Sequence, residues 1–288
     1  MDDKDWLIIR TVYELKNITR AAQQLHTSQP ALSYRLRQIE RKLNVQLFDM
    51  SGKVLTFTPQ GEQIVYYADR ILNDYQQMKE ALLLADERLR GEIRIGAYSN
   101  YAAYRLPALM RRYHDRYPDV ELRLVTGLSH DIFAQLQRGE IHLALVREET
   151  HWKEGKRVVD RNHYYAINRH PLALADLPTL PQIRISNMPY PYVGDTIDRW
   201  WNSVFSQPPH IVMTVDKIEI CLELVKHGLG FALLADYLDF PPELHPQLLH
   251  DADGRALDNH TWLLYRHSAV FSPRLAHFID LFSEEPQV

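Results

Sequence analysis

The sequence predicts a multidomain α+β protein with three parts: a small helical module with a β-hairpin, a long connecting helix and a two-lobed α/β domain. Three observations predict this class. The first 58 residues contain three helix-like segments and a hairpin pattern. Apolar residues then recur in steps of four and three across residues 59–90. From residue 91 onward, short apolar strands alternate with helices.

The composition is typical of a globular protein. Of the 288 residues, 45% are hydrophobic and 24% are charged, and the length suffices for more than one domain. The single cysteine excludes an internal disulfide framework, and the sequence has neither a secretion-signal pattern nor an apolar run of membrane-spanning length. We therefore expect a cytoplasmic protein without membrane partners. The net charge of -4 conceals a basic cluster, because residues 28–43 carry four Arg or Lys and one Glu.

Three helices are predicted in the N-terminal module, over residues 4–16, 19–25 and 28–43. Thr19 is placed to cap the second helix and Ser28 the third. A proline near the start of the third helix is tolerated, because the first N–H groups of a helix have no intrahelical partner. Two helices joined by a tight turn, the second with an exposed polar start, form the pattern of a helix-turn-helix.

The exposed face of the third helix lies opposite a stripe of four leucine and isoleucine residues. Gln29 and Ser33 lie at its leading edge, and Tyr34 and Arg37 follow. Any amphipathic surface helix places charges opposite its apolar stripe, and this ordinary interpretation explains most such patterns. Here small hydrogen-bonding residues occupy the N-terminal end, where a helix in the major groove meets base edges. The pattern therefore favours double-stranded DNA as a partner.

A hairpin is predicted after the third helix, because residues 45–61 alternate apolar and polar around Ser51, Gly52 and Lys53. After a helix-turn-helix, such a hairpin is typical of a wing, with Lys53 at its tip near a phosphate. Thr58 is expected to cap the next helix.

These segments together resemble the winged helix-turn-helix of the LysR-type transcriptional regulators. The resemblance rests on an ordered set of residues: Ala21, Ala22, Leu25, Ser28, Gln29, Pro30, Ala31, Ser33, Glu40, Leu43, Leu47, Phe48, Thr58 and Gly61. The sequence departs from the family pattern at Asn44, usually glycine, at Met50, frequently arginine, and at Gln60, frequently alanine. Asn44 can still take the left-handed cap conformation, whereas Met50 removes a phosphate contact from the wing.

The resemblance implies a sequence-specific transcription regulator that binds promoter DNA, and it leaves RNA polymerase open as a further partner. Base edges or adjacent phosphates are expected to face Gln29, Ser33 and Tyr34, while Arg35, Arg37 and Lys53 neutralise phosphates. The full expected DNA interface is Thr27, Ser28, Gln29, Pro30, Ser33, Tyr34, Arg35, Arg37 and Lys53.

A long helix is predicted from Pro59 to about Leu89, with apolar residues spaced as a heptad seam. The alternative is a helix that packs only on its own domain. At 1.5 Å per residue, however, the helix is roughly 45 Å long and extends past a small winged domain. We therefore expect dimerisation through Ile64, Ala68, Ile71, Tyr75, Met78 and Leu82. The family resemblance raises the expected assembly from a homodimer to a homotetramer.

The C-terminal part is predicted to be a run of βαβ units with a mainly parallel sheet. Its first elements are strands at 93–97, 120–125 and 143–146 and helices at 102–116 and 129–138. This pattern alone predicts an α/β fold, and the resemblance implies a periplasmic-binding-protein-like effector domain of two lobes. The expected boundaries are 1–58 for the DNA-binding module, 59–90 for the connecting helix and 91–288 for the effector domain. Within the effector domain, lobe one is expected to comprise residues 91–161 and 265–288, and lobe two residues 162–264.

Polar residues follow three of the predicted strands, and open α/β sheets bind ligands at such strand ends, beside helix N-termini. The expected effector contacts are Ser99, Asn100, Tyr101, Thr126, Gly127, Arg147 and Arg266. An arginine at a strand end between the lobes resembles the family subgroup that responds to citrate-like carboxylates. We therefore expect a small anionic metabolite paired with Arg147, with Arg266 as a second cation. In the alternative interpretation, Arg147 simply pairs with Glu148, Glu149 or another surface acid.

No catalytic, cofactor or metal chemistry is expected. The 14 histidines lack metal-ligand spacing, and Cys221 lies among apolar residues, as expected of an inert buried thiol. An enzyme or a solute-binding protein on the same fold is the main rival class. An enzyme needs a nucleophile or an acid–base pair that the sequence does not offer, and a solute-binding protein needs an export signal. A DNA-binding architectural protein would leave the two lobes without a role.

Overall fold

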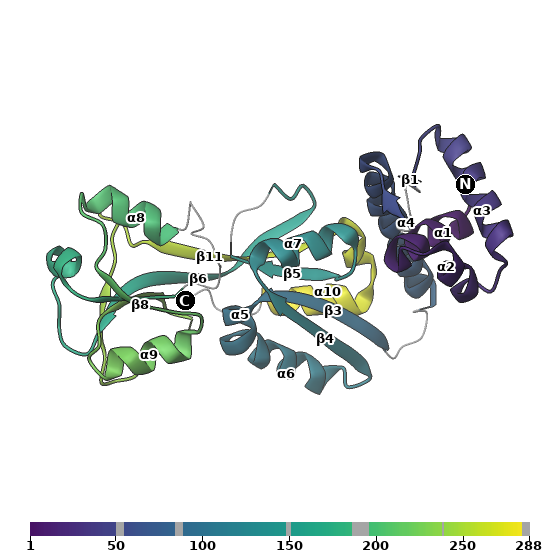
Figure 1. Ribbon diagram of the computed structural model, residues 1–288. Coiled ribbons are helices and arrows are strands. Elements are labelled where there is room, and N and C mark those ends of the chain that lie inside the picture. Colours follow the sequence, from purple (N-terminus) through teal and green to yellow (C-terminus); the bar gives the residue numbers. More distant parts are fainter. Residues whose placement is uncertain (50–54, 84–88, 148–150, 186–195, 238, 284–288) are drawn as a thin grey trace.

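The computed structural model describes the chain except for residues 50–54, 84–88, 148–150, 186–195, 238 and 284–288. The molecule is elongated, with the N-terminal module at one end, the first lobe in the middle and the second lobe at the far end (Figure 1). Among the described residues, no helix combines the length and apolar character needed to cross a membrane.

The N-terminal module contains α1 (Asp3–Leu15), α2 (Ile18–Gln24), α3 (Gln29–Leu43), β1 (Phe48–Asp49) and β2 (Thr56–Phe57), with β1 and β2 antiparallel. The predicted cap of the second helix is wrong, because Asn17 Oδ1 accepts the N–H of Arg20 at 3.0 Å and Thr19 lies inside α2. Ser28 caps α3 as predicted, through the N–H of Ala31. Asn44 ends α3 in the left-handed conformation, as expected.

Helix α4 (Pro59–Leu83) packs the start of its length against α1, and the predicted extension over residues 84–88 lies outside the described residues. Thr58 Oγ1 accepts the N–H of Gly61 at 2.9 Å, so Thr58 caps this helix as predicted. Gly61 allows a close approach, because a Cβ there would lie 1.9 Å from the carbonyl oxygen of Leu47. The first turn of α4 is thereby fixed to the end of the helix-turn-helix.

The first lobe is a mixed sheet covered on both faces. It contains β3 (Gly91–Tyr98), α5 (Ser99–Tyr104), α6 (Leu106–Arg116), β4 (Val120–Gly127), α7 (Ser129–Arg138), β5 (Leu143–Val146), β11 (Asp258–Tyr265), η2 (His267–Phe271) and α10 (Pro273–Leu281). Strand β3 pairs in parallel with β4 and β5, as the βαβ pattern predicts. The expectation of a mainly parallel sheet is wrong, because β11 pairs antiparallel with both β5 and β6. Helix α7 packs on one face of the sheet, and α6 and α10 share a core on the other.

The second lobe is built on the far half of β6 (Gly155–Asn168), which pairs antiparallel with two shorter strands. Its remaining elements are η1 (Leu174–Thr179), β7 (Gln182–Ile185), α8 (Thr196–Val204), β8 (Ile211–Val215), α9 (Ile218–Lys226), β9 (Ala232–Ala235) and β10 (His245–Leu248). Strands β7 and β8 are parallel to each other. Figure 1 shows α8 and α9 on the outer flanks of this lobe.

Two strands, β6 and β11, carry the chain between the lobes (Figure 1). They pair antiparallel from His163 with Asp258 to Gly155 with Tyr265, with an irregularity between Thr261 and Trp262. The end of β11 also pairs with β5, which anchors it in the sheet of the first lobe. These paired strands therefore connect the lobes, and a small change in their twist would alter the relative angle of the lobes.

Candidate functional site

The N-terminal end of α3 presents an exposed polar face. Gln29 Nε2 donates a hydrogen bond to Ser33 Oγ at 3.0 Å, and Gln38 Nε2 donates one to the hydroxyl of Tyr34 at 2.7 Å. The side chain of Tyr34 is 64% exposed, and Thr27, Ser28, Gln29 and Pro30 are exposed as well. The structure thus brings the described base-reading candidates together on one surface.

Arg37 is exposed on the same helix, whereas Arg35 is held by α1. Arg35 Nε donates to Asp5 Oδ1 at 2.5 Å, and its Nη2 donates to Asp2 Oδ2 at 2.8 Å. Asp5 is fully buried, and its hydrogen bond and charge raise the pKa of the Arg35 guanidinium. The expectation that Arg35 neutralises a phosphate is therefore corrected, because its guanidinium is already paired with two carboxylates. Lys53 lies outside the described residues.

The predicted dimerisation seam on α4 divides into two parts. Ala68 is fully buried, and Ile64 packs against the same core of the N-terminal module, so the structure directs them into their own chain. The prediction that Ala68 contacts a second copy is therefore wrong, because its side chain is buried within its own chain. Ile71, Tyr75 and Met78 are 40%, 44% and 49% exposed and continue the seam on the surface. The side chain of Leu82 lies outside the described residues.

The predicted effector residues at three strand ends lie along one edge of the first-lobe sheet. Ala97 pairs with Thr126 and Tyr98 with Gly127, so Ser99 and Asn100 begin α5 beside the end of β4. Arg147 follows β5 at the same edge, and its N–H donates to Ser129 Oγ at 3.1 Å. Ser129 therefore holds the end of β5 rather than capping α7, whose N-cap is Leu128.

Tyr101 belongs to the core beneath this edge. Its side chain is 1% exposed, and its ring centroid lies 5.8 Å from that of Tyr98. A direct contact between Tyr101 and a ligand would therefore require it to leave its packed position.

A cluster of buried polar groups adjoins Arg147, and the sequence reasoning missed it. The hydroxyls of Tyr98 and Thr261 are 2.8 Å apart, and Asn259 Nδ2 donates to the hydroxyl of Tyr237 at 2.7 Å. Burial raises the pKa of both phenols, and the positive charge of Arg147 partly opposes the rise for each. The signal that could have revealed it is the run of four polar residues that opens β11, because Asn259 and Thr261 lie two positions apart and so share its buried face.

The lobes are bridged from the end of α5. The Tyr104 hydroxyl donates to Glu219 Oε1 of α9 at 2.7 Å, and burial together with this carboxylate raises the pKa of Tyr104 to about 12. Arg105 Nη2 donates to the carbonyl of Asp236 at 3.3 Å, and its Nε lies 3.6 Å from Asp160 Oδ2. Helix α5 therefore starts at the candidate effector edge and ends on the second lobe.

Arg266 does not join the other predicted effector residues. Strand β11 runs antiparallel to β5, with Tyr265 opposite Leu143, so Arg266 emerges at the opposite edge of the sheet from Arg147. There its Nη2 donates to the carbonyl of Gln137 at 2.9 Å, and its Nη1 lies 3.3 Å from Asp74 Oδ1. The expectation of a second effector cation is corrected by this strand direction.

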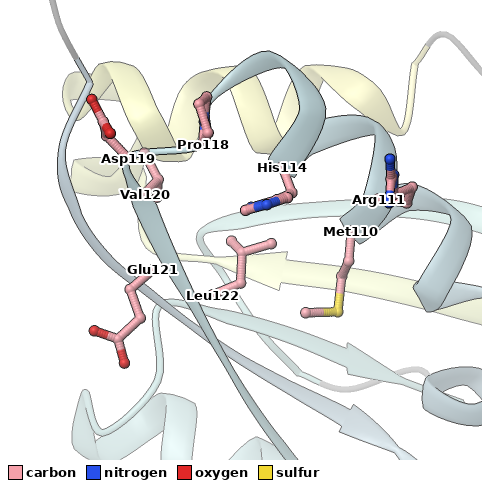
Figure 2. Close-up of a pocket in the computed structure, with 8 residues that line it drawn as sticks. All are labelled: Met110, Arg111, His114, Pro118, Asp119, Val120, Glu121 and Leu122. Carbon is pink, nitrogen blue, oxygen red and sulfur yellow. The ribbon is translucent and has the colours of Figure 1, made fainter.

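An open depression of about 550 Å³ lies elsewhere on the first lobe, between α6 and the edge strand β4. Figure 2 shows Met110, Arg111 and His114 on α6, with Leu122 on the neighbouring strand β4. It includes none of the predicted effector residues. Within the described part of the chain, no group of three or more His, Cys, Asp or Glu side chains is arranged to hold a metal. Burial raises the pKa of the Cys221 thiol to about 12, which makes it a poor nucleophile.

Both halves of the chain match models of known protein families. Residues 4–62 match the bacterial regulatory helix-turn-helix proteins of the lysR family, and residues 86–287 match the LysR substrate binding domain. YraN of Bacillus subtilis, an uncharacterized HTH-type transcriptional regulator, is 33% identical over 289 residues, which cover 100% of this chain and 99% of YraN. The HTH-type transcriptional regulator CysB of Haemophilus influenzae is 28% identical over 96% of this chain and 88% of its own length.

Solved structures share the complete architecture. A full-length OxyR variant from Pseudomonas aeruginosa has a TM-score of 0.66 at 20% identity, over 98% of this chain and 94% of that one. Full-length CbnR in complex with its target DNA has a TM-score of 0.65 at 19% identity, over 98% of this chain and 99% of that one. At these identities the likeness shows the fold, from the helix-turn-helix through the connecting helix to the two-lobed domain.

Proposed function

The chain belongs to the LysR family of bacterial helix-turn-helix transcription regulators, and on that premise we propose that it reads promoter DNA with α3 and responds to a small carboxylate bound beside Arg147. The exposed start of α3 is the observation that carries the DNA-binding half. Gln29, Ser33 and Tyr34 offer amide and hydroxyl groups there, and such groups can pair with base edges in the major groove.

The DNA-binding proposal is tested by comparing two exposed residues of α3. Gln29→Ala removes a base-reading amide, so it should weaken binding to the cognate site by about 1–3 kcal/mol and hardly affect random DNA. Arg37→Ala removes a phosphate contact, so it should weaken both and reduce the salt slope by about one. Mobility-shift titrations with DNA from upstream of the gene that encodes this protein, and with random DNA, measure this difference. Equal losses on both DNAs for Gln29→Ala would remove it as a base reader.

The carboxylate half of the proposal rests on the edge where three strands end. Arg147 supplies a guanidinium, and α5 and α7 direct their N-termini toward the same edge. Helix N-termini favour negative charge, and a guanidinium pairs with a carboxylate through two parallel hydrogen bonds. A di- or tricarboxylate fits this chemistry better than a neutral or cationic metabolite. Ser99, Asn100 and Thr126 would add hydroxyl, amide or backbone donors.

Titration calorimetry with citrate, shorter dicarboxylates and uncharged analogues tests this assignment. Citrate binding should be lost in Arg147→Ala and kept in Arg255→Ala, which removes an exposed arginine from a turn of the second lobe. Binding of neutral metabolites alone, or an unchanged citrate affinity in Arg147→Ala, would contradict the role of Arg147.

We further propose that two copies associate through the exposed part of the α4 seam, and that effector domains join such dimers into a tetramer over two half-sites. The exposure of Ile71, Tyr75 and Met78 supports the first contact, because three large apolar side chains on one helix face are otherwise left in water.

A further inference from the structure

The first lobe contacts α4 through the C-terminal end of α7. Asn73 Nδ2 donates to the carbonyl of Arg138 at 2.7 Å. Arg266 completes the junction, because its guanidinium donates to the carbonyl of Gln137 at 2.9 Å and lies 3.3 Å from the carboxylate of Asp74. Asn73 of the connecting helix thus contacts the end of α7 directly, and Asp74 is linked to it through Arg266. We call this set the α4–α7 junction.

The junction is closely packed. Arg266 is 5% exposed, so its pairing with Asp74 is shielded from water on the side of the first lobe. Its positive charge lies at the carbonyl end of α7, where the helix dipole favours a cation. Gly139 follows at φ 73°, and a Cβ there would lie 3.0 Å from Asn73. Only a residue without a side chain therefore fits this close approach comfortably.

Charges from both neighbouring domains also act on Asp69 of α4. Burial raises the pKa of Asp69, and the charges of Arg10 and Glu14 on α1 and of Glu140 and Arg138 in the first lobe act on it in turn. One face of the connecting helix, at Asp69, therefore lies between the DNA-binding module and the first lobe.

The other end of α7 lies at the candidate effector edge. Ser129, its first residue, accepts the backbone N–H of Arg147. Between its ends, Ile132 and Leu136 are fully buried against the sheet, so the helix is packed along its length. Its 10 residues span roughly 15 Å at the usual rise of 1.5 Å per residue. Figure 1 shows α7 lying over β5.

We infer that α7 acts as a rigid strut. Effector binding at Arg147 displaces it, and the α4–α7 junction passes this displacement to the connecting helix. This inference rests on the proposed function, since it takes Arg147 as the effector-binding residue. A ligand that moves the start of α7 displaces a rigid helix, whose far end carries the carbonyls bound to Asn73 and Arg266. The two DNA-binding modules of a dimer would then change their relative orientation. Arg266 is a positioning residue in this scheme and touches no ligand.

The junction is first tested without any ligand, by a double-mutant cycle in the full-length protein. Asp74→Asn, Arg266→Gln and the double variant are compared by thermal unfolding. Because the two side chains pair directly, the loss in the double variant should be smaller than the sum of the single losses. Arg70→Ala is the matched control, since Arg70 lies 4.0 Å from Asp74 on the same helix and its pairing is also lost in Asp74→Asn. Additive losses would overturn the junction.

The transmission is then tested with a surface variant that leaves Arg266 in place. Asn73→Ala combined with Asp74→Asn should abolish the change in DNA affinity that citrate causes in the wild type, while calorimetric citrate affinity stays within about twofold. A full citrate response in this variant would overturn the strut. Should the wild type bind no citrate, the carboxylate proposal fails by itself. The strut is then tested by the DNA affinity of the protein without ligand. The Asn73→Ala, Asp74→Asn variant should shift this affinity at least threefold, and Arg70→Ala should leave it unchanged. An unshifted DNA affinity in the double variant overturns the strut.

Discussion

Arg35 and Arg37 lie two positions apart on α3, which separates their side chains by about 200° around the helix axis. Arg35 faces α1, where the fully buried carboxylate of Asp5 accepts hydrogen bonds from the guanidinium and from the N–H of Asp2. Arg37 faces solvent on the side of Gln29 and Tyr34. The same residue type therefore holds two helices together at one position and is available to a phosphate at the other.

Substitution of each arginine separates the two roles. Arg35→Ala should lower the unfolding midpoint of the N-terminal module, because it leaves the buried carboxylate of Asp5 without its nearest cation. Arg37→Ala should leave the midpoint unchanged and weaken DNA binding. Thermal unfolding and a DNA titration on the same preparations measure both effects. Equal midpoints for the two variants would contradict the structural role of Arg35.

His142 gives the first lobe a pH dependence of stability. Its Nδ1 accepts the N–H of Arg94 at 3.0 Å, and burial, with the charges of Arg94 and Arg274, lowers its pKa to about 3. Below pH 6.5 the unfolded chain therefore binds a proton that the folded chain does not. Stability should fall as the pH drops toward 3, by up to about 1.4 kcal/mol for each pH unit from this one group.

The variant His142→Asn keeps an acceptor near Arg94 and removes the titration, so its unfolding midpoint should fall less between pH 7 and pH 4.5. His114→Asn, at an exposed position of α6, is the control and should follow the wild type. Parallel curves for His142→Asn and the wild type would show that other groups cause the acid sensitivity.

Among the elements, α4 carries one apolar seam whose first part is buried and whose later part is exposed. Its first turns bury Ala68 against α1, and its later turns expose Ile71, Tyr75 and Met78. The heptad spacing indicated the seam from the sequence, because spacing reports which residues share a face. It could not indicate where the seam passes from buried to exposed, since that depends on how far α1 extends along α4.

A charge in the exposed part of the seam tests its role in assembly. Ile71→Asp should dissociate the dimer and abolish cooperative DNA binding, because a carboxylate would be buried against a second helix. Gln63→Asp places the same charge on an exposed position of α4 and should leave the assembly intact. Light scattering at micromolar concentration measures the mass. A monomeric wild type would refute the proposed contact.

The connections at strand ends show what sequence patterns can and cannot predict. The edge formed by Ser99, Thr126 and Arg147 followed from the βαβ pattern, because parallel strands end on the same side. Arg266 could not be placed in this way, since its side depends on whether β11 runs with or against β5. Helix 102–116 was also predicted as one unit, and the structure divides it at Arg105 into α5 and α6. That division lets Tyr104 and Arg105 reach the second lobe.

At the scale of the whole molecule, the lobes are joined by the β6–β11 ribbon and bridged by Tyr104 and Arg105. If a carboxylate binds beside Arg147 and draws the lobes together, amide exchange should slow at the ends of β3 and β4 and along residues 160–163 and 258–261. Hydrogen–deuterium exchange with and without citrate measures this change. Arg147→Ala should show no slowing. Slowing confined to the outer flanks of the lobes would contradict binding at this edge.

The position of β11 in the sheet also determines the order in which the protein can be completed during synthesis. Strands β5 and β6 are consecutive in the chain, yet β11 lies between them in the sheet. Strand β11 begins about 90 residues after β6 ends. Until residues 258–265 leave the ribosome, both strands carry an unpaired edge, and exposed strand edges promote aggregation. The N-terminal module needs only the first 68 residues for its core. A nascent chain would therefore complete its DNA-binding module well before its first lobe, and a truncated product would keep the module and lose the lobe.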